Sequence, residues 1–110
     1  MDVKILEIKN SINELLINLC TRIDDICNGF KINNTMDNDR IINLIDDINV
    51  LSEGINIIKD YYNSIDILEF SEKLNMLYSA FESRDYHLFA DTLEYEFKPL
   101  LEYWIECLKN

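Results

Sequence analysis

The chain has few of the residues that interrupt regular structure. Its 110 residues include two glycines and one proline. Strand-rich folds need a turn signal about every 8–12 residues, and so few turn-forming residues cannot supply them. The sequence therefore predicts an all-α protein with few connections. A hydrophobic content of 48% with 28% charged residues is typical of a globular chain, and the length predicts one domain spanning residues 1–110.

Basic residues are also scarce, and they are outnumbered by acidic ones. Ten Lys and Arg face 21 Asp and Glu, which gives a net charge of −11. This balance excludes binding to nucleic acid through its phosphates and to anionic lipid surfaces. No apolar run approaches the roughly 18 residues of a membrane span. The first ten residues, MDVKILEIKN, contain Asp2 and Glu7 and no small-residue cleavage site, so we expect no secretory signal and a cytoplasmic protein with neither nucleic acid nor membrane as partner.

Motifs for common cofactors and metals are missing. The chain contains no Cys-x-x-Cys, no glycine-rich phosphate loop and a single histidine, His87. Of its three cysteines, Cys20 and Cys27 lie seven residues apart on one predicted helix. That spacing is roughly 10 Å, too long for a disulfide. We expect thiols in a reducing compartment, and no cofactor.

Apolar residues recur at spacings of three and four, and this pattern predicts four helices. Their expected spans are about 3–28, 38–62, 65–83 and 86–109. The residues expected to cap or stop these helices are Asp2, Gly29, Thr35 or Asp37, Asn63 with Ser64, and Asp85. Because short connections force sequential helices to run antiparallel, we expect an antiparallel four-helix bundle with up-down-up-down topology.

The second predicted helix has a wider apolar face than a bundle core needs. A row of residues beside its main apolar stripe is also hydrophobic: Ile42, Ile45, Val50, Ile57 and Tyr61. A homodimer or a groove for a partner would cover this excess, whereas in the alternative interpretation the tyrosines line the rim of the core. Gly54 lies within the same helix and suggests a close contact with a neighbouring helix.

The only proline, Pro99, lies in the stretch DTLEYEFKPLLEYW and allows two interpretations. It either opens a new short helix, or it kinks one continuous helix by removing a hydrogen bond to the carbonyl of Tyr95. The apolar residues Leu93, Phe97 and Leu100 keep helical spacing through the proline. The pattern therefore favours a proline-kinked last helix.

The run RDYHLFADTLEYEFKPLLEYW, residues 84–104, resembles the C-terminal signature of an uncharacterised family of small acidic helical proteins from low-GC Gram-positive bacteria, a domain of unknown function. The resemblance implies an intracellular helical protein and brings no catalytic residues. Acidic and aromatic positions in this run are candidates for a shared interaction surface. These candidates are Asp91, Glu94, Tyr95, Glu96, Tyr103 and Trp104.

The leading functional hypothesis is a cytoplasmic, non-enzymatic protein–protein interaction module, chaperone-like or adaptor-like, with a possible homodimer. The alternative is a metal-binding regulator or small enzyme that uses His87, Asp91 and Glu94, which share one helical face at i, i+4 and i+7. A di-iron site is excluded because it needs Glu-x-x-His pairs, and the residue three before the only histidine is Arg84. We expect no catalytic and no metal-binding residues.

Overall fold

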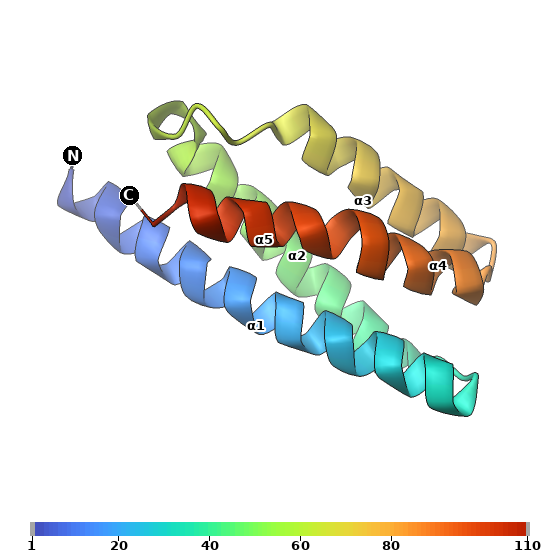
Figure 1. Ribbon diagram of the computed structural model, residues 1–110. Coiled ribbons are helices and arrows are strands. Elements are labelled where there is room, and N and C mark those ends of the chain that lie inside the picture. Colours follow the sequence, from blue (N-terminus) through green and yellow to red (C-terminus); the bar gives the residue numbers. More distant parts are fainter. Residues whose placement is uncertain (1, 110) are drawn as a thin grey trace.

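The computed structural model describes residues 2–109 and is helical almost throughout this range. Its last helix runs without interruption (Figure 1). One turn within that helix is π-helical. The elements are α1 (Val3–Asn33), α2 (Asn38–Ile58), the 3₁₀ turn η1 (Lys59–Tyr61), α3 (Ile67–Glu82), α4 (Tyr86–Thr92), the π turn η2 (Leu93–Phe97) and α5 (Lys98–Cys107). With α4, η2 and α5 counted as one helix, the all-α, four-helix prediction is confirmed for the described residues.

Each of these four helices begins at an aspartate. The carboxylate accepts hydrogen bonds from backbone N–H groups two or three residues further on, which stabilises a helix by about 1 kcal/mol. The capping residues are Asp2, Asp37, Asp66 and Asp85. Three of them were predicted. The expected cap at Asn63–Ser64 is wrong, because Asp66 caps α3 and Ile65 is buried just before it.

The first helix continues beyond the predicted stop at Gly29. It ends at Asn33, and Asn34 takes the left-handed conformation with φ 54° while its N–H donates to the carbonyl of Phe30 at 2.7 Å. Asparagine tolerates this conformation and can replace glycine at a helix end. The additional turn brings Lys31 within reach of the last helix.

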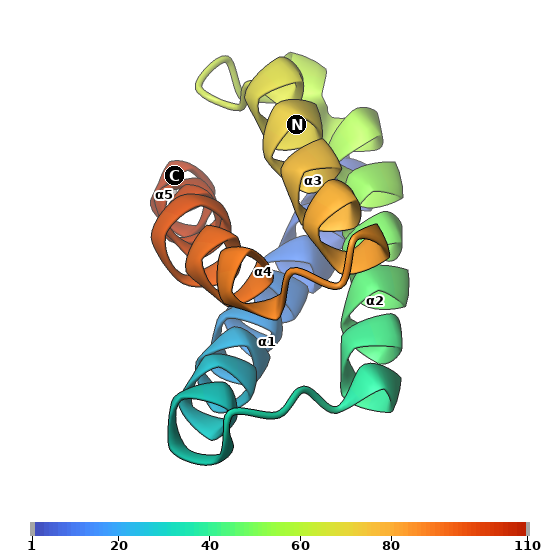
Figure 2. The ribbon, with the colours of Figure 1, turned by 90° about the vertical axis from the view of Figure 1, so that its right-hand side faces the viewer.

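The helices pack as two hairpins, α1 with α2 and α3 with the last helix (Figures 1 and 2). Arg22 of α1 pairs with Asp47 of α2. Ile12, which comes earlier in α1, lies beside Gly54, which comes later in α2. The two helices therefore run in opposite directions. The molecule measures 46 × 22 × 20 Å. The up-down-up-down order of the whole bundle stays a prediction.

The core lies between the hairpins, and α1 contacts helices of both of them. This helix packs against α2 and against α4, η2 and α5. Trp104 is fully buried and stacks on Phe70 with ring centroids 5.0 Å apart, while Phe70 also contacts Phe97. These three rings join α3 to the last helix. None of the helices in residues 2–109 is long and apolar enough to cross a membrane.

Pro99 lies at the start of α5, directly after the π turn. The Lys98 N–H donates to the carbonyl of Leu93, five residues back rather than four. The backbone of Leu93, Phe97 and Lys98 stays in the right-handed helical region. The helix therefore passes through the proline without a break, and the wider turn is the local distortion that accompanies the proline, as is common where a helix bends.

Candidate functional site

A shallow groove runs along the surface between α1 and α2. Its volume is about 440 Å³, and its lining is mainly apolar. The lining residues are Glu7, Ile8, Ser11, Ile12, Leu15, Val50 and Gly54. Val50 is 56% exposed, and Ile57, three residues after Gly54 on α2, is 52% exposed. The groove is thus a mainly apolar surface that no part of residues 2–109 covers.

The groove is open at this point because small residues line it. A Cβ added to Gly54 would lie 3.0 Å from the Cγ1 and Cδ1 atoms of Ile12, so α1 and α2 approach as closely as a glycine permits. This confirms the close contact expected for Gly54. Ser11 presents only a short side chain beside it. The groove therefore lies over Ile12, whose side chain belongs to the buried core.

The edges of the groove are acidic. Glu7 and Glu14 lie on the outer side of α1, seven residues apart and so on one helical side, and Asp46 and Glu53 flank Val50 at i−4 and i+3 on α2. None of these four carboxylates forms an ion pair with another described residue. They leave an uncompensated negative rim around an apolar floor.

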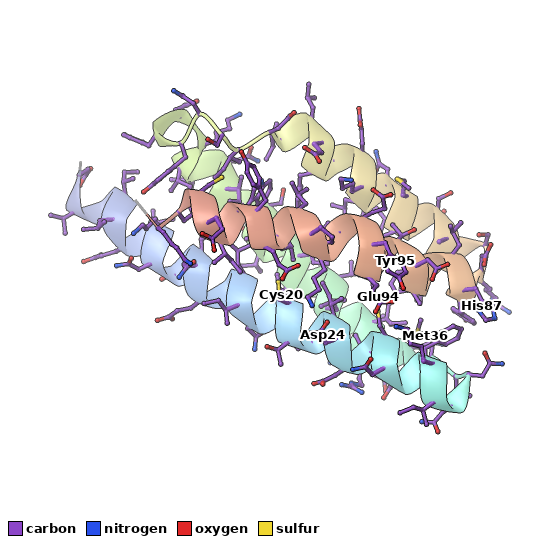
Figure 3. The ribbon with its side chains drawn as sticks, in the orientation of Figure 1. Cys20, Asp24, Met36, His87, Glu94 and Tyr95 are labelled. Atoms are coloured by element: carbon purple, nitrogen blue, oxygen red, sulfur yellow. The ribbon has the colours of Figure 1, made fainter. Side chains whose placement is uncertain are left out.

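The opposite side of α1, which faces the last helix, is built differently. Lys31 Nζ lies 2.7 Å from Glu94 Oε1, and Lys98 Nζ lies 2.7 Å from Asp24 Oδ1. The hydrogen bond from Lys98 to Asp24 raises the pKa of this lysine. Asp24 and Glu94 are visible along this seam in Figure 3. Two lysine side chains therefore close the seam between α1 and the last helix.

Two cysteines lie within this closed seam. Burial raises the pKa of the Cys20 thiol to about 11, and the Glu102 carboxylate adds to the shift. Burial likewise raises the pKa of the Cys27 thiol to about 11, with Glu94 contributing. The Cys27 thiol donates to the carbonyl of Ala90 at 3.6 Å. Because the thiolate is the reactive form, both groups are structural thiols.

The residues predicted to form an interaction surface on the last helix are exposed, ion-paired or, in the case of Trp104, buried. Asp91, Tyr95 and Tyr103 are exposed on the outer side of this helix. Glu94 and Glu96 are engaged in ion pairs, with Lys31 and with Lys73 respectively.

Trp104 was predicted on that surface, and this placement is wrong. The side chain is fully buried, and its Nε1 finds no acceptor in residues 2–109. Trp104 is buried because it belongs to the apolar stripe of the last helix, which faces the core. The spacing of that stripe in the sequence already indicated a core position.

The metal-binding alternative has no geometric support. In the described range no group of three His, Cys, Asp or Glu side chains is arranged to hold a metal ion. The His87 ring packs edge-on against Phe30 at 4.9 Å, and Glu94 points to Lys31 instead.

The fold and the groove define a small all-α bundle with an open helix–helix seam between α1 and α2. The chain belongs to the family described as Domain of unknown function (DUF8042), whose match covers residues 7–107. The resemblance seen in residues 84–104 is thereby confirmed as membership of an uncharacterised domain family. Comparisons with curated proteins and with solved structures gave no match.

The sequence indicated part of the groove and missed the rest. The excess apolar row on α2 was recognised, including Val50 and Ile57. The contribution of Ile8, Ser11 and Leu15 was missed, because their exposure depends on how α1 is placed against α2. One signal in the sequence could have indicated these residues. Gly54 is the only glycine of its predicted helix, and the first predicted helix contains Ser11 next to Ile12, a combination that allows two helices to approach closely.

Proposed function

We propose that this protein is a cytoplasmic, non-enzymatic protein–protein interaction module, chaperone-like or adaptor-like, and that the groove between α1 and α2 is its binding surface. The observation that carries the proposal is the uncovered groove of about 440 Å³, which has a mainly apolar floor and carboxylates along its edges. Contiguous exposed apolar surface with a polar rim is a mark of interaction sites.

Three further features support this function. The apolar floor lies between two packed helices, so it is held in place before a partner binds, which lowers the cost of binding. The cysteines are free thiols, as expected in a reducing compartment. The exposed residues Tyr95 and Tyr103 offer aromatic side chains on the last helix for self-association or further contacts.

Site-specific photocrosslinking tests this proposal. A photoreactive amino acid is introduced at Val50 or at Ile42, which is 48% exposed on the same helix about 12 Å away. In the native cell, we expect a discrete crosslinked protein from position 50 and none, or a much weaker one, from position 42. Equal crosslinking from both positions would contradict the assignment of the groove.

A further inference from the structure

We propose that the groove binds a single amphipathic helix of a partner protein, with apolar residues on its contact side and Lys or Arg on both flanks. This inference rests on the proposed function and specifies the partner. It follows from the shape of the groove and from the charges along its edges.

The shape of the groove fits a helix better than a strand. The distance from Ile8 to Leu15 along α1 is seven residues, about 10 Å, which equals the rise between residues i and i+7 of a bound helix. The groove can thus accept three anchors at i, i+3 or i+4, and i+7. A strand would need an exposed sheet edge with unpaired backbone groups, whereas both walls here are helices.

The charges specify the flanks of this helix. Glu7 lines one edge, and helical spacing places Glu14 beside it on α1 and Asp46 and Glu53 beside Val50 on α2. None of these four carboxylates forms an ion pair with a described residue. Of the cations on the groove side of α1, Arg22 already pairs with Asp47 at one end. Lys4 is exposed at the other end of this side. Basic residues on either side of the apolar anchors would meet both acidic edges.

A second copy of the chain is a poor occupant. Each copy has a net charge of −11, and two facing grooves would bring eight rim carboxylates together, four from each copy, against one exposed Lys4 from each copy. Like charges facing each other across an interface disfavour the complex. The charge pattern therefore selects a basic partner over self-association at this site.

The test uses three fluorescent peptides of about 18 residues that share leucines at helical anchor positions. Their flanking residues are lysine, glutamine or glutamate. Binding to the full chain is measured by fluorescence anisotropy at about 0.1 M and 0.5 M salt. We expect the lysine peptide to bind at least about tenfold more tightly than the glutamine peptide, the glutamate peptide to bind most weakly, and the lysine advantage to shrink at high salt.

Matched variants locate the binding site. Val50→Lys should weaken both the lysine and the glutamine peptide by about tenfold or more, because it places a charge on the apolar floor. Ile42→Lys adds the same charge on the same helix outside the groove and should change either affinity less than about threefold. The double variant Glu7→Gln, Glu53→Gln should reduce the lysine advantage, whereas Glu72→Gln, Glu82→Gln on α3 should preserve it. Circular dichroism and urea midpoints verify that each variant is folded.

The possible outcomes separate the two proposals. If all three peptides bind equally and Val50→Lys weakens them all, the basic-helix inference fails and the proposed function stands. If none binds, or if binding is insensitive to Val50→Lys, both fail. If sedimentation shows a dimer that Val50→Lys dissociates, the occupant is a second copy and the inference is overturned.

Discussion

The two sides of α1 are both helix–helix seams, yet one is closed and the other is open. Towards the last helix, Lys31 and Lys98 pair with acidic residues across the seam and their side chains lie over it. Towards α2, Gly54 and Ser11 leave the floor uncovered, and the carboxylates of Glu7 and Glu53 form no ion pair with another described residue, although Arg22 pairs with Asp47 at one end of the seam. The comparison shows that the length and charge of the bordering side chains decide whether a seam becomes structural or remains available.

The largest effect is expected from a change in the core of the closed side. Trp104→Ala should lower the free energy of unfolding by about 3–5 kcal/mol, because a fully buried aromatic side chain is replaced by a cavity. Tyr103→Ala, at the next residue and 53% exposed, should change it by less than about 0.5 kcal/mol. Urea denaturation followed by circular dichroism measures both, and similar losses would contradict the assignment of Trp104 to the core.

Thiol alkylation distinguishes the two sides directly. A pKa near 11 instead of the ordinary 9.0 lowers the thiolate fraction of Cys20 and Cys27 about 100-fold at about pH 8. Both should react at least about 100-fold more slowly in the folded chain than in urea, and faster as the pH approaches 11.

The variant Ser11→Cys places a thiol on the open side for comparison. It should be alkylated at least about tenfold faster than Cys20, because Ser11 is exposed at the groove. Peptide mass spectrometry of timed iodoacetamide reactions gives the rate at each site. Slow reaction at position 11 would show that the groove is covered.

The ion pairs of the closed seam should contribute a smaller amount. In a double-mutant cycle, Lys98→Met and Asp24→Asn should show a coupling of about 0.5–1 kcal/mol, since this pair is partly exposed. Urea denaturation at low and high salt measures the coupling, which should decrease with salt. A coupling of zero would mean that the lysine stem closes the seam by packing alone.

An effect of similar or smaller size is expected at the two glycines. Gly29→Ala should stabilise the chain by up to about 1 kcal/mol through helix propensity, because an added Cβ meets nothing within 4 Å. Gly54→Ala should gain the same stabilisation from helix propensity, but the added Cβ must displace Ile12, which offsets most of that gain. The net change in the free energy of unfolding should stay within about 1 kcal/mol and be less favourable than for Gly29→Ala. Thermal and urea denaturation of both variants give the difference, and equal stabilisation would contradict a close contact at Gly54.

Local signals in the sequence predicted the fold well. The spacing of apolar residues gave the four helices, and their positions before these stripes identified Asp2 and Asp85 as caps and Asp37 as one of two candidates, with Thr35. The end of α1 was predicted wrongly because glycine is the commoner residue at a helix end. In this chain Asn34 adopts the left-handed conformation and Gly29 remains helical.

The groove could be predicted only in part, for a physical reason. Excess hydrophobicity on α2 is a property of one helix and is visible in its sequence. Which of those residues border a groove depends on the register between α1 and α2, fixed by contacts such as Ile12 with Gly54 and Arg22 with Asp47. The error at Trp104 has the opposite origin, because a family resemblance was given more weight than the apolar stripe to which the residue belongs.

The π turn before Pro99 has a consequence for comparing members of this family. A turn closed by a bond to the fifth residue back contains one residue more than an α-helical turn. A relative without the proline can therefore lose one residue between positions 92 and 98 and keep Phe89 and Trp104 in the core. Such a relative would show a single-residue gap inside a helix, at a place where gaps are normally treated as alignment errors.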